Sequence, residues 1–151
     1  MNEKDYKEQI LKIYKALFRV ALSILQNEQD AADCLQEAVL RGWIKRKQLK
    51  NPESFRAWMT KITLSEARNL QRKLIRQRKT PPAPAPSQSS SVKSALFSIP
   101  EKYRVPLILF YMDGYSTREI AEMLNIPEGR LRERMRAGRV KIRRLMEDDE
   151  N

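Results

Sequence analysis

The sequence YSTREIAEMLNIPEGRLRERMRAGR, residues 115–139, predicts two helices joined by a tight turn. Ser116 is followed three residues later by Glu119, which is the spacing of a capping box at the start of a helix. The inward side of this first helix is expected to carry three apolar residues, Ile120, Ala121 and Leu124. The residues NIP then turn the chain, and a second helix is expected to begin near Pro127.

This second helix is strongly basic. Residues 130–144 hold eight basic residues and one acidic residue. Its apolar residues recur at helical spacing and are expected on one side: Leu131, Met135, Gly138, Ile142 and Leu145. A tight pair of helices with a basic second member is typical of a helix-turn-helix, whose second helix lies in the major groove. A plain helical hairpin has the same pattern, and the charge favours the DNA-binding interpretation.

Upstream of this pair, Pro100 is expected to open another helix, which the residues DGYS end. The segment before that helix reads TPPAPAPSQSSS, residues 80–91, with four prolines and a run of three serines. Proline blocks a helix, so this segment predicts a linker that is stiff first and then flexible. We therefore expect a first domain over residues 1–79, a linker over 80–91 and a second domain over 92–151.

The first domain is predicted to hold three helices, which makes the fold all-α. The first carries Ile10, Ile13, Tyr14, Leu17, Ala21, Ile24 and Leu25 on its core side, and Asn27 is expected to help end it. The second is expected from about Gln29 to Gln48, with Ala31, Cys34, Leu35, Ala38, Val39 and Trp43 facing inward. The third, capped by Asn51 or Ser54, carries Phe55, Trp58, Met59, Ile62 and Leu70.

The charge points to a polyanionic partner. The 151 residues carry a formal charge of +11, with 30 Lys and Arg against 19 Asp and Glu. Residues 41–79 alone hold 13 basic and two acidic residues. With the basic helix near the C-terminus, this distribution predicts two separate basic surfaces, one in each half, that follow nucleic-acid phosphates.

Other classes of function are disfavoured. The chain has no His, and its one Cys, Cys34, is predicted to be a small core residue, so neither a metal site nor a cofactor is expected. No Gly-rich phosphate loop is present, and the protein is predicted not to be an enzyme. The longest apolar run, residues 105–112, is too short to span a membrane. With a lone Cys and no signal sequence at its start, the chain is predicted to be cytoplasmic.

Three motifs, in order, resemble the extracytoplasmic-function (ECF) sigma factors of bacterial RNA polymerase. DAADCLQEAVLRGW, residues 30–43, resembles the family's polymerase-clamp-binding helix. FRAWMTKI, residues 55–62, resembles its promoter-melting helix, and IPEKYRVPLILFYMDGYSTREIAEMLNIPEG, residues 99–129, is similar to its minus-thirty-five-binding domain. The resemblance implies a three-helix sigma-2-like bundle and a helix-turn-helix sigma-4-like domain, joined by the Pro/Ser-rich linker. It also implies a role in transcription initiation, with core RNA polymerase (clamp and flap) and promoter DNA as partners.

The resemblance implies roles for matching residues. The polymerase-binding set is Asp33, Gln36, Glu37, Leu40 and Arg41. The set for the opened minus-ten strand is Lys47, Lys50, Asn51, Arg56, Lys61, Arg68 and Arg72. The set for the minus-thirty-five element is Arg118, Arg130, Arg132, Glu133, Arg134 and Arg136. Trp58 has the position to stack on a base, but its helical spacing favours the core.

The sequence departs from the family pattern in the linker, which is short and lacks the family's typical acidic residues, and in two helices. Residues 64–69 read LSEARN, whereas ECF sigma factors usually have Arg, Asn and Asp in this stretch. Glu133 stands where a small hydroxyl residue is usual, and Ala137 where Arg is usual. An unusual promoter preference is therefore expected. The sequence leaves open whether an anti-sigma factor binds this protein. It also leaves the alternative of a stand-alone helix-turn-helix regulator that binds DNA without polymerase.

Overall fold

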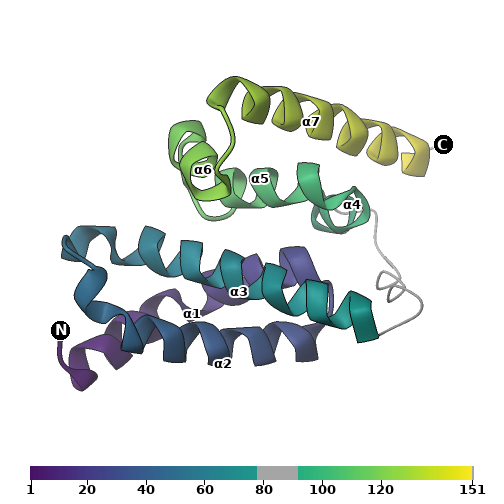
Figure 1. Cartoon of the computed structure of the whole chain (residues 1–151). Coiled ribbons are helices and arrows are strands. Elements are labelled where there is room, and N and C mark those ends of the chain that lie inside the picture. Colours follow the sequence, from purple (N-terminus) through teal and green to yellow (C-terminus); the bar gives the residue numbers. More distant parts are fainter. Residues whose placement is uncertain (78–91, 151) are drawn as a thin grey trace. The chain divides into compact units, whose positions relative to one another are not determined.

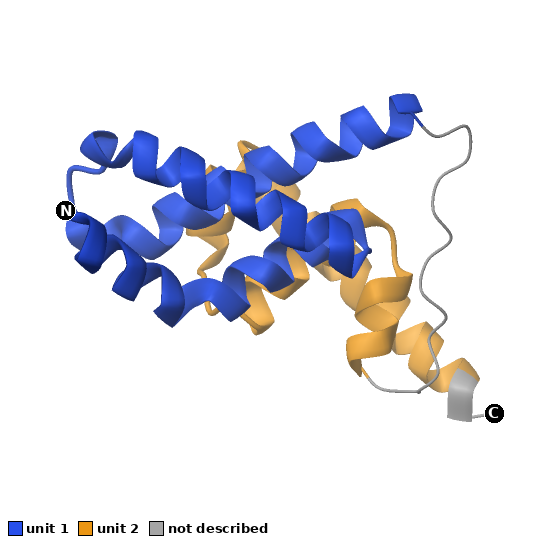
Figure 2. Cartoon of the chain, turned by 90° about the horizontal axis from the view of Figure 1, so that it is seen from below, with its two compact units in different colours: residues 1–81 blue, residues 82–151 orange. Residues whose placement is uncertain are grey.

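The computed structural model describes residues 1–77 and 92–150, and the linker predicted over residues 80–91 lies outside these ranges. The chain divides into two compact units, Met1–Pro81 and Pro82–Asn151 (Figure 2). The described residues form seven α-helices and two short 3₁₀ turns, with no strand (Figure 1). The all-α prediction is confirmed.

The first unit is a bundle of three helices, α1 (Glu3–Leu25), α2 (Glu28–Ile44) and α3 (Phe55–Gln77), each packed against the other two. Two 3₁₀ turns, Arg46–Gln48 and Pro52–Ser54, fill the connection between α2 and α3. The second helix is therefore shorter than predicted, because the chain leaves the α-helix after Ile44.

The boundary between α1 and α2 differs from the prediction. The residue that ends α1 is Gln26, which adopts a left-handed conformation with φ 53° and donates its backbone N–H to the Leu22 carbonyl. Asn27 instead begins α2, because its side chain accepts a hydrogen bond from the backbone N–H of Asp30 at 2.9 Å. An Asn placed directly before a run of helix formers caps the next helix by this bond.

The core of the first unit is rich in aromatic rings. Tyr6, 4% exposed, lies with its ring centroid 5.3 Å from that of Trp43 and 5.9 Å from that of Phe55. Trp58 is half-buried against this cluster, as predicted for a core position. Tyr14, predicted to lie in the core, is 41% exposed. Tyr6 occupies the interior instead, at a position outside the apolar stripe predicted from the sequence.

The second unit is built on α5 (Glu101–Tyr111) and α7 (Glu128–Glu150), which pack together. The shorter helices α4 (Val92–Ser98) and α6 (Thr117–Leu124) both contact α7. The helix α4 was not predicted. It contributes Ala95 and Leu96 to the core.

The helix-turn-helix forms as predicted. Ser116 and Glu119 make the capping box of α6, and Ile120, Ala121 and Leu124 are buried. Leu131 and Met135 at the start of α7 are also buried. The apolar stripe of α7 reaches the surface toward its end, where Leu145 is 37% exposed. This leaves the second half of α7 with more free surface than the first.

Candidate nucleic-acid interface

The outward side of α2 carries four residues of the predicted polymerase-binding set at the surface, Asp33, Gln36, Glu37 and Leu40. They recur at three- and four-residue spacing, which places them on one side of the helix. Leu40 is 51% exposed. A large apolar side chain ringed by polar ones at the surface is typical of the centre of a protein interface.

Arg41, the fifth residue of this set, is bound to another helix. Its Nε lies 2.6 Å from Oε1 of Glu66 on α3, and Glu66 is largely buried while Arg41 is half-exposed. Both residues line a shallow cleft between α2 and α3, which Asp33 and Glu37 also line. Arg41 is therefore held in place by α3 instead of extending freely into solvent.

Ile44 lies one turn after Leu40 on α2 and was not predicted as part of this surface. Its side chain is 66% exposed, so Leu40 and Ile44 together make an apolar strip. The spacing of four residues between them would have indicated this from the sequence. The predicted helix continued to Gln48, so Ile44 was not recognised as the last residue of α2 or as part of its exposed apolar strip.

The connection between α2 and α3 exposes Lys47 and Lys50, both from the predicted minus-ten set. Asn51 is exposed, but its side-chain oxygen accepts a hydrogen bond from the backbone N–H of Glu53 at 3.1 Å. Arg46, which was not predicted, packs its guanidinium 3.7 Å from the centroid of the Trp43 ring and donates to the Trp43 carbonyl at 2.8 Å. Arg46 thereby anchors the connection to the aromatic core.

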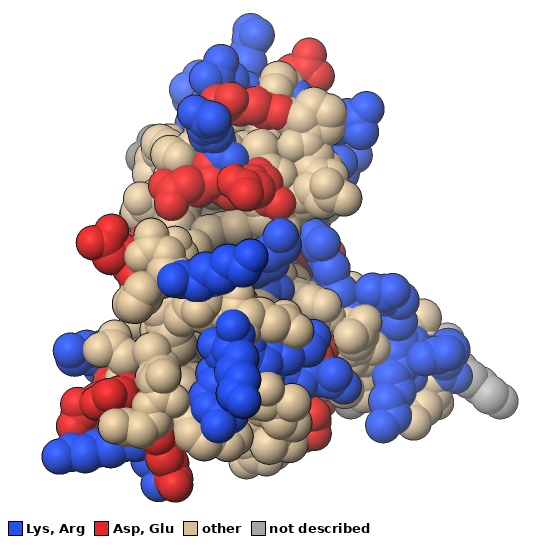
Figure 3. Space-filling view, turned by 60° about the vertical axis from the view of Figure 1, so that its left-hand side comes forward, with Lys and Arg blue, Asp and Glu red and all other residues tan. Residues whose placement is uncertain are grey.

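The surface of α3 presents the remaining residues of the minus-ten set. Lys61 and Arg72 are exposed and Arg68 is half-buried. Their spacing of seven and four residues places them on one side of the helix, whereas Arg56 lies on another side near its start. Arg72 donates from Nη2 to the Asn69 side chain at 3.4 Å. Figure 3 shows many Lys and Arg side chains on the visible surface of each unit, with Asp and Glu side chains among them.

The minus-thirty-five set lies on α6 and the first turns of α7. Arg118, Arg130, Glu133 and Arg136 are exposed, and Arg134 is half-buried. Arg132 donates from Nη2 to Oε1 of Glu128 at 2.8 Å, and the same oxygen accepts from the Thr117 hydroxyl at 3.1 Å. Glu128 thus ties the start of α6 to the start of α7 and holds Arg132 against its own helix.

Close packing of α7 on α5 depends on Gly138. A Cβ atom at this position would lie 2.8 Å from Cδ1 of Leu107 and 3.1 Å from Cβ of Tyr103. Both distances are below ordinary van der Waals contact, so the absence of a side chain lets the two helices approach. The basic surface of α7 is therefore held on a rigid support.

Three ionisable groups, Cys34, Tyr6 and Arg104, are buried in the cores, and Cys34 lies at the base of the cleft between α2 and α3. Burial raises the pKa of the Cys34 thiol to about 12, helped by the negative charge of Glu66. Burial also raises the pKa of Tyr6 to about 12, against the opposing effect of a backbone hydrogen bond. Arg104 is 4% exposed, and burial lowers its pKa while Glu101 opposes the shift; its Nη1 donates to the Ile99 carbonyl at 2.6 Å. A thiol with so high a pKa is not a nucleophile at neutral pH.

Residues 1–77 and 92–150, the ranges that the structure describes, lack two features. No group of three or more His, Cys, Asp or Glu residues there is placed to hold a metal ion. No helix in those ranges has the length and apolar character needed to cross a membrane.

Two family descriptions match the chain. Sigma-70 region 2 matches residues 10–79, and sigma-70 region 4 matches residues 89–142. Together they cover both helical units described above.

Relatives with known names agree. The ECF RNA polymerase sigma factor SigW of Bacillus subtilis is 27% identical, over 97% of this chain and 92% of SigW. The ECF sigma factor SigE of Mycolicibacterium smegmatis is 28% identical, over 84% of this chain and 56% of SigE. Both names describe sigma factors of one type.

Solved structures share the fold. The sigma factor RpoE from Bartonella quintana, in complex with the anti-sigma factor NepR, matches with a TM-score of 0.81 at 24% identity, covering 95% of this chain and 98% of RpoE. CnrH, in complex with the cytosolic domain of CnrY, matches with a TM-score of 0.73 at 22% identity, covering 98% of this chain and 91% of CnrH. The chain belongs to the sigma-70 family and is an RNA polymerase sigma factor of the extracytoplasmic-function type.

Proposed function

We propose that this sigma factor divides its work between its two helical units. Residues 1–79 bind the polymerase clamp and the opened minus-ten strand, and residues 92–151 bind the minus-thirty-five element, with residues 80–91 as the linker between them. The observation that carries this proposal is the distribution of surface residues. In the first unit, one side of α2 exposes polar residues around an apolar one, and one side of α3 is basic. In the second unit, α6 and α7 form a helix-turn-helix, and α7 is basic.

Polymerase binding is assigned to Asp33, Gln36, Glu37, Leu40 and Arg41. Exposure of Leu40 supports this, because an apolar side chain at the surface gains most when a partner covers it. Acidic residues beside it favour a basic partner surface and would raise the association rate. Arg41, held by Glu66, presents its remaining donors in a fixed direction.

Binding of the opened minus-ten strand is assigned to Lys47, Lys50, Asn51, Arg56, Lys61, Arg68 and Arg72. Single-stranded DNA is bound by a basic groove that follows its phosphates, combined with surfaces that receive unstacked bases. The basic side of α3 supplies the first, and the segment between α2 and α3 supplies exposed side chains for the second.

Binding of the minus-thirty-five element is assigned to Arg118, Arg130, Arg132, Glu133, Arg134 and Arg136. An exposed Arg can bind guanine by two hydrogen bonds, and Glu can accept one from cytosine N4. Arg132 is held by Glu128 in the free protein, so a role in reading a base requires it to leave that partner. Glu133 is exposed at the position where the family usually has a hydroxyl residue.

The protein is proposed to act in the cytoplasm, where its polymerase works, and without a catalytic activity of its own. The matched structures of RpoE and CnrH contain NepR and the cytosolic domain of CnrY. On that basis we propose that an anti-sigma factor also regulates this chain.

The test is reconstitution with core polymerase. The labelled protein should bind core polymerase by itself, and the resulting complex should select promoters from a random-sequence library in run-off transcription. A stand-alone regulator would instead bind duplex DNA specifically without polymerase and would not support initiation. That second result would overturn the proposal.

A further inference from the structure

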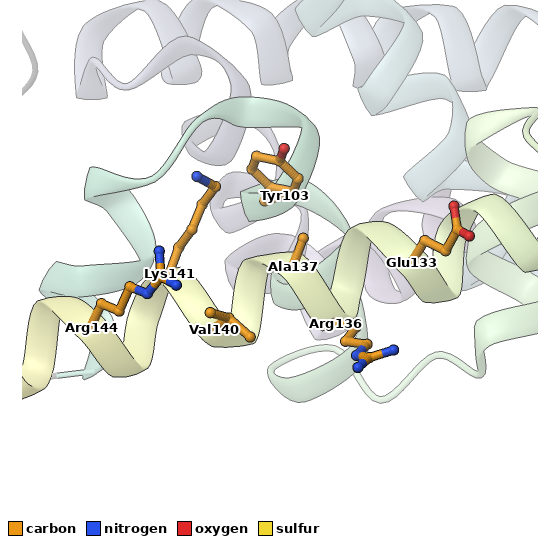
Figure 4. Close-up of a pocket in the computed structure, with 7 residues that line it drawn as sticks. All are labelled: Tyr103, Glu133, Arg136, Ala137, Val140, Lys141 and Arg144. Atoms are coloured by element: carbon orange, nitrogen blue, oxygen red, sulfur yellow. The ribbon is translucent and has the colours of Figure 1, made fainter.

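A shallow hollow of about 400 Å³ lies on the surface of the second unit, between α5 and the middle of α7. Tyr103 on α5 and Ala137 on α7 line it, as do Arg136, Lys141 and Arg144. In Figure 4, Ala137 points toward Tyr103, Lys141 reaches toward the tyrosine ring from the next turn, and Glu133 lies at the other end. The hollow is therefore asymmetric, with Glu133 at one end, Lys141 and Arg144 at the other, and Arg136 between them.

Positive charge surrounds the Tyr103 ring. The Lys102 ammonium lies 5.0 Å from the ring centroid and the Lys141 ammonium 5.3 Å from it. An aromatic face attracts cations at these distances and so helps to keep both near the hollow. Four cationic side chains, Lys102, Arg136, Lys141 and Arg144, thus lie in or beside it against one carboxylate, Glu133.

Ala137 keeps this hollow open. Its side chain is a methyl group that extends no further than Cβ. A long side chain there would occupy the space beside Tyr103.

The position of the hollow along α7 indicates which part of a bound DNA duplex would lie beside it. Helix α7 has 23 residues. At about 1.5 Å per residue it is roughly 34 Å long, whereas the major groove is about 12 Å wide. When the first turns of such a helix enter the groove end-on, its later turns lie outside the groove, beside the sugar-phosphate backbone. Ala137 to Arg144 lie about 13 to 24 Å from the start of α7, beyond the width of the groove.

We propose that the hollow binds one phosphate group of duplex promoter DNA, held by Lys141 and Arg144 of α7 and by Lys102 of α5. This inference rests on the proposed minus-thirty-five role of α7 and adds a site that contacts no base. It strengthens binding on all sequences equally, because a phosphate contact carries no base information. An acidic protein segment is the competing occupant of such a surface, and the experiment separates the two.

The experiment uses the full chain assembled with core polymerase and a duplex promoter selected from a random-sequence library. Lys141→Gln and Arg144→Gln should each weaken promoter binding about 3- to 10-fold at low salt and lower the log–log salt slope by about 1. Ala137→Leu fills the hollow without removing a charge and should weaken binding with the base preference unchanged. Arg143→Gln is the matched control, since Arg143 carries the same charge but does not line the hollow.

Single phosphates of the promoter are then replaced by neutral methylphosphonates. At one phosphate position, the replacement should weaken promoter binding by the wild-type complex several-fold but should not weaken binding by the Arg144→Gln complex any further. Promoter binding by the Arg143→Gln complex should still be weakened by the replacement at that position. The proposal is overturned if no phosphate shows this coupling, or if Arg143→Gln and Arg144→Gln behave alike. It is also overturned if the variants bind DNA normally but lose affinity for core polymerase. Failure of the wild-type complex to bind any promoter would instead refute the proposed function.

Discussion

A Cβ atom on Gly42 would lie 2.5 Å from the phenolic oxygen of Tyr6 and 2.6 Å from the sulfur of Met59. The Tyr6 hydroxyl donates to the Val39 carbonyl on the same turn of α2. Gly42 therefore allows α2 to approach the aromatic core closely enough for this hydrogen bond to form. The side of α2 to which we assign polymerase binding lies on the helix that this contact positions.

Gly42→Ala should destabilise the first unit. The added methyl group must displace the ring of Tyr6, and overpacking of this kind costs about 1 to 3 kcal/mol. Urea unfolding followed by circular dichroism measures the change in the free energy of unfolding. Gly129→Ala is the control, because a Cβ there meets nothing within 4 Å, and it should leave stability unchanged or slightly raised. Equal stabilities for the two variants would show that α2 shifts freely.

Leu40→Asp should abolish binding to core polymerase while the helix content stays intact. Leu40 is exposed, so the substitution costs the free protein little, but it places a charge in the centre of the proposed interface. Fluorescence anisotropy with labelled protein gives the affinity. Ile44→Asp should weaken binding in the same direction. Leu11→Asp on α1, where the side chain is 75% exposed, should have no effect. Unchanged affinity in Leu40→Asp would count decisively against the assignment.

Glu133→Ala should relax sequence choice at one position of the minus-thirty-five element. A carboxylate that accepts a hydrogen bond from cytosine contributes about 1 to 3 kcal/mol of discrimination. Binding of the reconstituted complex to a library of single-base variants measures this. A uniform gain in affinity across all sequences would mean that Glu133 only repels phosphate.

Cys34 should be unreactive in the folded protein. Its pKa is raised to about 12, so the thiol stays protonated at pH 8 and the reactive thiolate is scarce. Because the unfolded thiol ionises near pH 9, this group makes folding less favourable as the pH rises from 9 toward 12. A thiol reagent at pH 8 should label the protein only at denaturant concentrations that unfold it. Rapid labelling under native conditions would show that α2 and α3 separate readily.

Much of the candidate site was predictable because surface charge and helical spacing are local properties. The outward position of Leu40 and the capping of α6 by Ser116 and Glu119 follow from residues only three or four apart. The pairing of Arg41 with Glu66 was not predictable, since 25 residues separate the two and only the packing of α2 on α3 brings them together. The same is true of the hollow at Ala137, which requires Tyr103 from another helix.

Three properties of this protein follow from its sequence alone: it is all-α, each of its two halves carries a basic surface, and the second half contains a helix-turn-helix. Those properties depend on periodicity, capping and charge, which act within a few residues. The packing of the helices places Tyr6 and not Tyr14 in the core, because both residues fit a helix and only the contact of α1 with Trp43 and Phe55 selects between them. It also decided where α2 ends and which basic side chains are already held by a partner, since those outcomes depend on contacts between residues far apart in the chain.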